Sequence, residues 1–239
     1  ATPEREYDKA LDEIIIPYIG PIIYEYNYLQ AYKDGVISDF KLINVYAPMD
    51  TQEELEYAEI SKKIGRRISI LGKLDTTDNT LKMLLINRAR LVNSTFLRVP
   101  AVIRILQQRP KGKWLIFTES IEQATLIDTI VSEKGYRSSL YHSSLDPVVR
   151  RTNLYHFKKN IIDILVSCRG LDEGFDVPNA DSAIIVSASA AVRQRIQRMG
   201  RVLRKSSSKE IASIFTIFSS EHEKKRVISE QERFLNNIE

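Results

Sequence analysis

Residues 114–131 read Trp-Leu-Ile-Phe-Thr-Glu-Ser-Ile-Glu-Gln-Ala-Thr-Leu-Ile-Asp-Thr-Ile-Val, and they predict a strand followed at once by a helix. The apolar run from Trp114 to Thr118 is typical of a strand that is buried on both faces. Ser120 and, three residues later, Gln123 form a capping box, which predicts a helix from about residue 121 to Val131. The stretch therefore predicts one strand–helix unit of an α/β fold.

The same alternation continues to residue 218. Further strands are predicted over residues 138–142, 162–167, 182–188 and 211–218, and Asp146 with Pro147 predicts the start of a helix that runs to about Phe157. Strands that alternate with helices form a parallel sheet with helices on both faces, because each parallel connection has to cross over the sheet. Ligands bind beyond the carboxyl ends of such strands, so the loops after His142, Ser167 and Ala188 are candidate sites.

The composition excludes several classes of protein. Of 239 residues, 43% are hydrophobic and 28% charged, as in globular proteins, and no apolar run approaches the ~20 residues of a membrane span. Residues 1–15 are charged and show no secretory signal pattern, so we expect a cytoplasmic protein, or a nuclear one in a eukaryote. The single cysteine, Cys168, and the three scattered histidines show no metal-ligand spacing, and no structural metal is predicted. The net charge of +4 is compatible with a polyanionic partner but does not establish one.

The first hundred residues have a different pattern. Strands are predicted over residues 22–28 and 42–46, whereas residues 50–108 have helical spacing, with a capping box at Thr51 and Glu54. This helical region is basic through Arg66, Arg67, Lys73, Lys82, Arg88, Arg90, Arg98 and Arg104. A solvated helix surface and a nucleic-acid contact surface both explain these charges, and the first is the commoner case.

Residues 197–204, Gln-Arg-Met-Gly-Arg-Val-Leu-Arg, predict a helix with two distinct faces. At 3.6 residues per turn, Gln197, Arg201 and Arg204 fall within a sector of roughly 60°, with an apolar stripe on the far side. The planar guanidinium group matches phosphate oxygens, so this row favours phosphate binding across a cleft, although a solvated basic face would give the same spacing.

Residues 171–178, Leu-Asp-Glu-Gly-Phe-Asp-Val-Pro, follow a predicted strand and indicate a binding loop. Gly174 allows close approach of a ligand to the backbone, and Asp176 places a carboxylate near the sheet edge. The phosphate-binding loop of two glycines, a lysine and a hydroxyl residue at fixed spacing is absent. The chain thus lacks half of a phosphoryl-transfer site.

Residues 111–218 resemble the second RecA-like lobe of a superfamily 2 helicase. Residues 114–118 resemble motif IV, residues 165–178 resemble motif V, and residues 197–204 resemble motif VI; His142-Ser-Ser-Leu followed by Arg150, Arg151 and Phe157 resembles the motif after IV. Within this superfamily, the chain resembles the branch that contains the XPB repair helicases and restriction-enzyme translocase subunits, through residues 20–26, 34–40 and 172–178. Residues 1–5 resemble the end of motif III.

The resemblance implies a role for each of these residues. Arg201 and Arg204 would be arginine fingers on an ATP, with Mg²⁺, held mainly by an N-terminal lobe, while Gln197, Gly174 and Asp176 would contact the nucleotide. Four residues at strand ends would bind the nucleic-acid backbone without sequence specificity: Thr118, Ser143, Ser167 and Arg169. Ser143 and Cys168 depart from the usual glycine and threonine of the family, so the resemblance supports these backbone contacts less than it supports the arginine fingers.

The expected organisation is an interlobe linker with strands over residues 1–48, a mainly helical, thumb-like insertion over 49–108, and a RecA-like domain over 109–239. The expected function is the C-terminal motor lobe of an ATP-dependent DNA helicase or translocase, with RNA as the second choice of nucleic acid and no activity in this chain alone. Two alternatives stay open: a stand-alone nucleic-acid-binding module, and a nucleotide-binding regulator on a doubly wound sheet.

Overall fold

The computed structural model describes residues 11–24, 30, 33–34, 39–75, 77–109, 112–168, 180–187 and 211–236. The strands are β1 (Asp39–Tyr46), β2 (Trp114–Thr118), β3 (Ser138–His142), β4 (Ile164–Cys168), β5 (Ser182–Ile185) and β6 (Ile211–Phe218). The helices are α1 (Ile16–Ile19, after a π-helical turn at Leu11–Ile15), α3 (Thr51–Leu71), α4 (Asn79–Asn93), α5 (Arg98–Gln108), α6 (Ile121–Glu133), α7 (Pro147–Lys158) and α9 (Glu221–Asn236).

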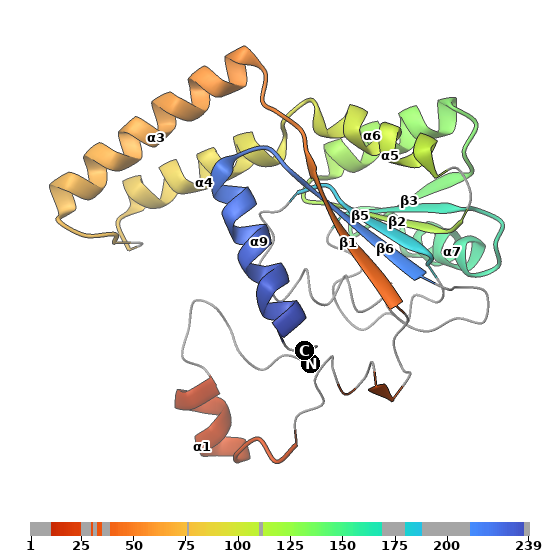
Figure 1. Ribbon diagram of the computed structural model, residues 1–239, viewed down its shortest axis with the longest axis horizontal. Helices are drawn as coiled ribbons and strands as arrows, with labels where there is room; N and C mark the ends of the chain where they lie inside the picture. Colours follow the sequence, from red (N-terminus) through yellow and green to blue (C-terminus); the bar gives the residue numbers. More distant parts are fainter. Residues whose placement is uncertain are drawn as a thin grey trace.

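The strands form one six-stranded sheet in the order β1-β6-β5-β2-β4-β3 (Figure 1). All five pairings are parallel, as the alternation of strands and helices predicts. Predicted and observed bounds agree for β2, β3 and β6, and differ by one to three residues at the ends of β4 and β5. The predicted α/β class is confirmed.

Hydrophobic residues cover both faces of the sheet, because successive residues of a strand point to opposite faces. Leu115 and Phe117 pack with Leu154 and Phe157 of α7 on one face. On the other face Trp114 and Ile116 lie in a cluster to which α5 and α6 contribute Val102, Ile105, Leu106, Ala124, Ile127 and Val131. All five residues of β2 are buried, so this strand forms the centre of the core.

The sheet draws on residues that precede 109. β1 pairs with β6 along its whole length, from Asp39 beside Ile211 to Tyr46 beside Phe218. α5 packs against the sheet through the second cluster. The strand predicted over residues 22–28 is wrong for its described part, since residues 22–24 are irregular. The division into three domains stays a prediction. The sheet and its core include β1 and α5, which precede the expected start of the RecA-like domain at residue 109.

The antiparallel pair α3–α4, called the hairpin below, extends away from the sheet (Figure 1). Its first helix is capped by Asp50, whose carboxylate accepts from the Glu53 amide at 2.8 Å while Glu53 accepts from the Asp50 amide at 2.9 Å. The capping box predicted at Thr51 and Glu54 is therefore one residue out of place. The prediction failed because two overlapping candidates, 50/53 and 51/54, both fit the capping pattern. Among the described helices, none has the length and apolar character of a membrane span.

Candidate functional site

The carboxyl edge of the sheet aligns the ends of β2, β3 and β4. The parallel register places Cys168 between Thr118 and His142, so the last residues of three strands form one row. Open parallel sheets bind their ligands beyond this edge. The row and the loops that follow it are therefore the candidate site.

Thr118 is fully buried at this edge. Its Oγ1 donates to the Ser120 carbonyl oxygen at 3.0 Å and lies 3.4 Å from the Ser167 carbonyl oxygen. Ser120 in turn accepts from the Gln123 amide at 3.1 Å as the N-cap of α6, which confirms that half of the predicted capping box, whereas the Gln123 side chain donates to the Asn93 carbonyl oxygen instead. Thr118 thus holds the turn between β2 and α6, and its hydroxyl lies below the surface.

Ser167 and Ser143 occupy opposite environments. Ser167 lies between Phe117 and Tyr141 in the sheet and is 1% exposed, and no partner for its Oγ lies within the described residues. Ser143 is exposed in the turn after β3. Of the predicted backbone-binding residues that the structure describes, Ser143 is the one whose side chain reaches solvent.

Six of the predicted site residues lie outside the described residues: Arg169, Gly174, Asp176, Gln197, Arg201 and Arg204. The structure does show where the chain leaves for the segments that contain them. Residues 169–179 follow β4, and residues 188–210 follow Ser187 just beyond β5. Because β4 and β5 flank β2 in the sheet, both segments begin at the candidate edge.

Arg98 is the residue that sequence reasoning misplaced, because it is fully buried and not part of a basic surface. Its guanidinium group donates to both carboxylate oxygens of Glu223 on α9, at 2.9 and 2.7 Å. It also donates to the carbonyl oxygens of Val92 at 3.0 Å, Ile217 at 2.8 Å and Val186. One side chain thereby connects α4, α5, α9 and the ends of β5 and β6.

A signal for this burial was present in the sequence. Arg98 precedes Val102, Ile105 and Leu106 by four, seven and eight residues, so helical spacing places it on the apolar face of α5. Burial lowers the pKa of the Arg98 guanidinium, and Glu223 opposes that shift by favouring the charged form. Its partners could not be found from the sequence, since Glu223 is 125 residues away.

A second polar cluster joins the end of α4 to the same edge. Ser187 donates through Oγ to the Asn93 side-chain oxygen, and Gln123 donates through Nε2 to the Asn93 carbonyl oxygen at 3.0 Å. Ser187 and Gln123 are both buried. Within the described ranges, no three His, Cys, Asp or Glu side chains form a group able to hold a metal ion.

Comparison with known proteins shows which proteins this chain is similar to. Residues 98–206 match the helicase conserved C-terminal domain. The chain is 27% identical over 222 residues to the DNA 3'-5' translocase XPB2 of Sulfurisphaera tokodaii, covering 86% of this chain and 48% of that protein. It is 25% identical over 215 residues to the DEAD-box ATP-dependent RNA helicase RhpA of Helicobacter pylori, covering 85% and 42%. The chain thus spans about half the length, or less, of these curated relatives, and the resemblance to restriction-enzyme subunits gains no support from them.

Solved structures agree in fold. The SWI2/SNF2 ATPase C-terminal domain of Sulfolobus solfataricus superposes with a TM-score of 0.57 at 12% identity, covering 81% of this chain and 87% of that one. The C-terminal domain of the DEAD-box protein Dbp5 superposes with a TM-score of 0.52 at 16% identity, covering 57% and 78%. Residues 98–206 therefore match the helicase conserved C-terminal domain, and the sheet has the fold of helicase and SWI2/SNF2 ATPase C-terminal domains.

Proposed function

We propose that this chain is the C-terminal motor lobe of an ATP-dependent DNA translocase or helicase. The observation that carries the proposal is topological: the two segments with the predicted nucleotide-binding residues both leave the carboxyl edge of the sheet, on either side of β2. The similarity to a DNA translocase over 86% of the chain supports DNA as the substrate. RNA is the second choice, in line with the similarity to an RNA helicase.

In this proposal the lobe completes an ATP site that the N-terminal lobe begins. The N-terminal lobe would hold ATP with Mg²⁺. Arg201 and Arg204 would contact the β and γ phosphates of that ATP once the two lobes close. Gln197 orients these arginines, while Gly174 and Asp176 approach the ribose. Charge-assisted bonds to the phosphates favour closure, and hydrolysis removes them, so the lobes separate and this lobe moves along the strand.

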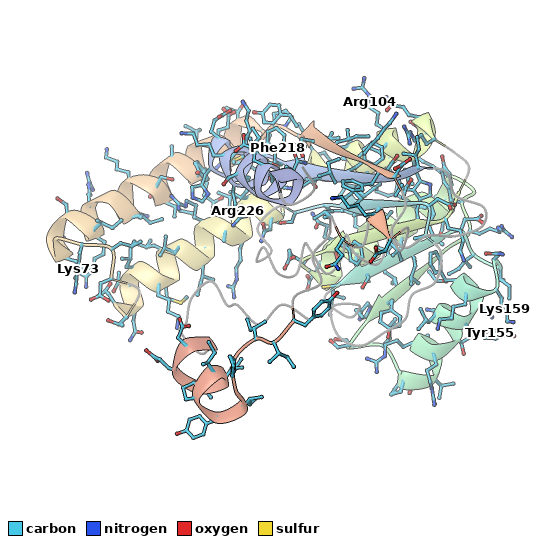
Figure 2. All side chains as sticks on the ribbon, turned by 60° about the horizontal axis from the view of Figure 1, so that its bottom comes forward. Lys73, Arg104, Tyr155, Lys159, Phe218 and Arg226 are labelled. Atoms are coloured by element: carbon cyan, nitrogen blue, oxygen red, sulfur yellow. The ribbon has the colours of Figure 1, made fainter. Side chains whose placement is uncertain are left out.

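The proposed nucleic-acid grip uses the candidate edge and the hairpin. Ser143 is exposed at the edge, whereas Thr118 and Ser167 would act by shaping the backbone around it. The distal part of the hairpin exposes Lys62, Lys63, Arg66, Lys73 and Lys82, and Lys73 lies at the end remote from the sheet (Figure 2). Such a surface binds phosphates independently of sequence.

The arginine roles are tested by Arg204→Ala in the full-length protein. We expect ATP turnover to fall about 10²- to 10³-fold, because the variant lacks the positive charge that contacts the transferring phosphate. The DNA dissociation constant should change little. Arg104→Ala is the matched control, because Arg104 is an exposed arginine on α5 (Figure 2). Turnover near that of the unchanged protein in Arg204→Ala would refute the role.

The basic hairpin also supports a second candidate, a nucleic-acid-binding module without motor activity. That candidate requires firm, salt-dependent DNA binding by these 239 residues alone, whereas a half-motor binds DNA and ATP weakly in isolation. Calorimetric titration of this chain with DNA and, separately, with ATP distinguishes the two. Tight ATP binding by the isolated chain would contradict both and favour a nucleotide-binding regulator.

A further inference from the structure

The hairpin is braced along its length, so its two helices act as one stiff unit. At its distal end the Arg67 guanidinium donates two bonds to the Asp78 carboxylate, at 3.0 and 2.5 Å, across the turn between α3 and α4. Nearer the sheet, Arg88 of α4 lies over the Tyr57 ring of α3, 5.8 Å from its centroid. A force at the tip is therefore carried to the base of the hairpin.

The base of the hairpin is attached to the core by buried polar contacts. The last two residues of α4, Val92 and Asn93, accept from Arg98 and Gln123 through their carbonyl oxygens, each at 3.0 Å. The Asn93 side chain also accepts from Ser187. Buried polar groups that lose their partners incur a desolvation cost, so the end of α4 cannot shift on its own without a penalty.

The other partners in these contacts lie at the end of β5. Val186 accepts from Arg98, and Ser187, the next residue, donates to Asn93. In the sequence, the segment with Gln197, Arg201 and Arg204 begins at the residue after Ser187. The hydrogen bond between Asn93 and Ser187 thus joins the hairpin directly to the start of the segment that carries the proposed arginine fingers.

We propose that Asn93 and Ser187 are positioning residues that couple nucleic-acid contact at the hairpin to ATP turnover. This inference rests on the proposed function. A displacement of the hairpin by bound DNA reaches the β5 end through this bond, and it aligns the arginine segment for catalysis. Arg98 and Glu223 hold the same β5 and β6 ends in place, but they form a buried ion pair whose loss would destabilise the whole chain, so they do not provide a clean test.

The test measures ATP turnover of the full-length protein with and without duplex DNA. Asn93→Ala and Ser187→Ala should each lower the DNA-stimulated kcat by about three- to tenfold, the effect of removing one hydrogen bond. Turnover without DNA and the DNA dissociation constant should stay within about twofold. The double variant should be no worse than the more affected single variant, because both changes remove the same bond.

Two control variants distinguish a loss of coupling between the hairpin and ATP turnover from a general destabilisation of the core. Asn93→Asp keeps the accepting side-chain oxygen and should retain most of the stimulation. Ser138→Ala removes a serine hydrogen bond that is also partly buried, the 2.6 Å contact of its Oγ with the Asp128 carboxylate at the opposite edge of the sheet, and should leave stimulation unchanged.

The outcomes are distinct. Full stimulation in Asn93→Ala, or multiplied losses in the double variant, would overturn the coupling while leaving the proposed function intact. Absence of DNA-stimulated turnover in the unchanged protein would overturn the proposed function and this inference together.

Discussion

At the scale of single residues, Arg98 shows how a buried charge is accommodated. Removing a guanidinium group from water costs several kcal/mol, and it is tolerated only when its donors are all satisfied. Here Glu223 supplies two acceptors and the backbone supplies three more, at the ends of α4, β5 and β6. Arg98, on α5, therefore forms more than one ion pair: it also orders the junction of α5 with four other elements, α4, α9, β5 and β6.

Arg98→Met should destabilise this chain by about 3–5 kcal/mol, because the buried Glu223 charge loses its counterion while keeping the Ser219 amide as a donor, and three carbonyl oxygens lose the guanidinium donor. Glu223→Gln should also be destabilising, because the buried Arg98 charge loses its counterion and the new amide NH2 group faces a guanidinium or backbone donor. Urea unfolding followed by the fluorescence of Trp114, a buried tryptophan and the single one in the chain, measures both.

Arg104→Met is the control for this series, because the side chain is exposed on the same helix and its loss should cost within about 0.5 kcal/mol. Equal costs for Arg98→Met and Arg104→Met would contradict the structural role of Arg98.

At the scale of elements, the turn of the hairpin depends on Asp78. Its carboxylate accepts from the Leu81 amide at 2.7 Å as the N-cap of α4 and also receives two bonds from Arg67. Hydrogen bonding to Arg67, then to the Leu81 amide, lowers the pKa of Asp78 from 3.8 to about 2. A lowered folded-state pKa stabilises the fold above the unfolded pKa, and that stabilisation is lost as the pH falls through the folded value.

Asp78→Asn should therefore lower the thermal unfolding midpoint at pH 6, and the difference from the unchanged chain should shrink as the pH falls from about 4 to about 2. Thermal unfolding monitored by circular dichroism at several pH values measures it. Arg67→Gln should reproduce much of this pH dependence, because Arg67 is the main cause of the shift. A difference between Asp78→Asn and the unchanged chain that is the same at pH 6 and pH 2 would contradict the argument.

At the scale of the whole molecule, the hairpin extends the lobe by a basic arm whose base is fixed to the sheet (Figures 1 and 2). From residue 60 onward its acidic side chains are Asp75 and Asp78, and Asp78 is paired with Arg67. The exposed lysines and Arg66 therefore dominate the distal surface. Under the proposed function, this surface would contact nucleic acid at a distance from the candidate edge.

Replacing Arg66 and Lys73 together by glutamine should weaken DNA binding by the full-length protein. The slope of log K against log salt should also decrease by about 1 for each phosphate that the variant no longer binds. Binding measured at several salt concentrations gives this slope. The double change Arg104→Gln and Lys159→Gln removes the same charge from α5 and the end of α7, away from the hairpin (Figure 2), and should leave it unchanged. Equal slopes in the two variants would argue against contact at the hairpin.

Local patterns of the sequence were enough to predict the sheet and most of its helices. β2, β3 and β6 follow from short apolar runs, and α6 and α7 from the caps at Ser120 and Asp146, because burial and capping act within a few residues. The predicted strand over residues 22–28 failed for residues 22–24, since an apolar run forms a strand only when a neighbouring strand supplies its hydrogen bonds.

By itself, the sequence determined the α/β class, the order of strands and helices, and the motifs that resemble a helicase lobe. Only the tertiary structure decided that β1 joins the sheet beside β6, that Arg98 lies in the core and that Asn93 meets Ser187 at the carboxyl edge. Asn93 and Ser187 are 94 positions apart in the sequence, and Arg98 and Glu223 are 125 positions apart. Such pairs form only when the whole core packs, and no local pattern of residues encodes a partner at that distance.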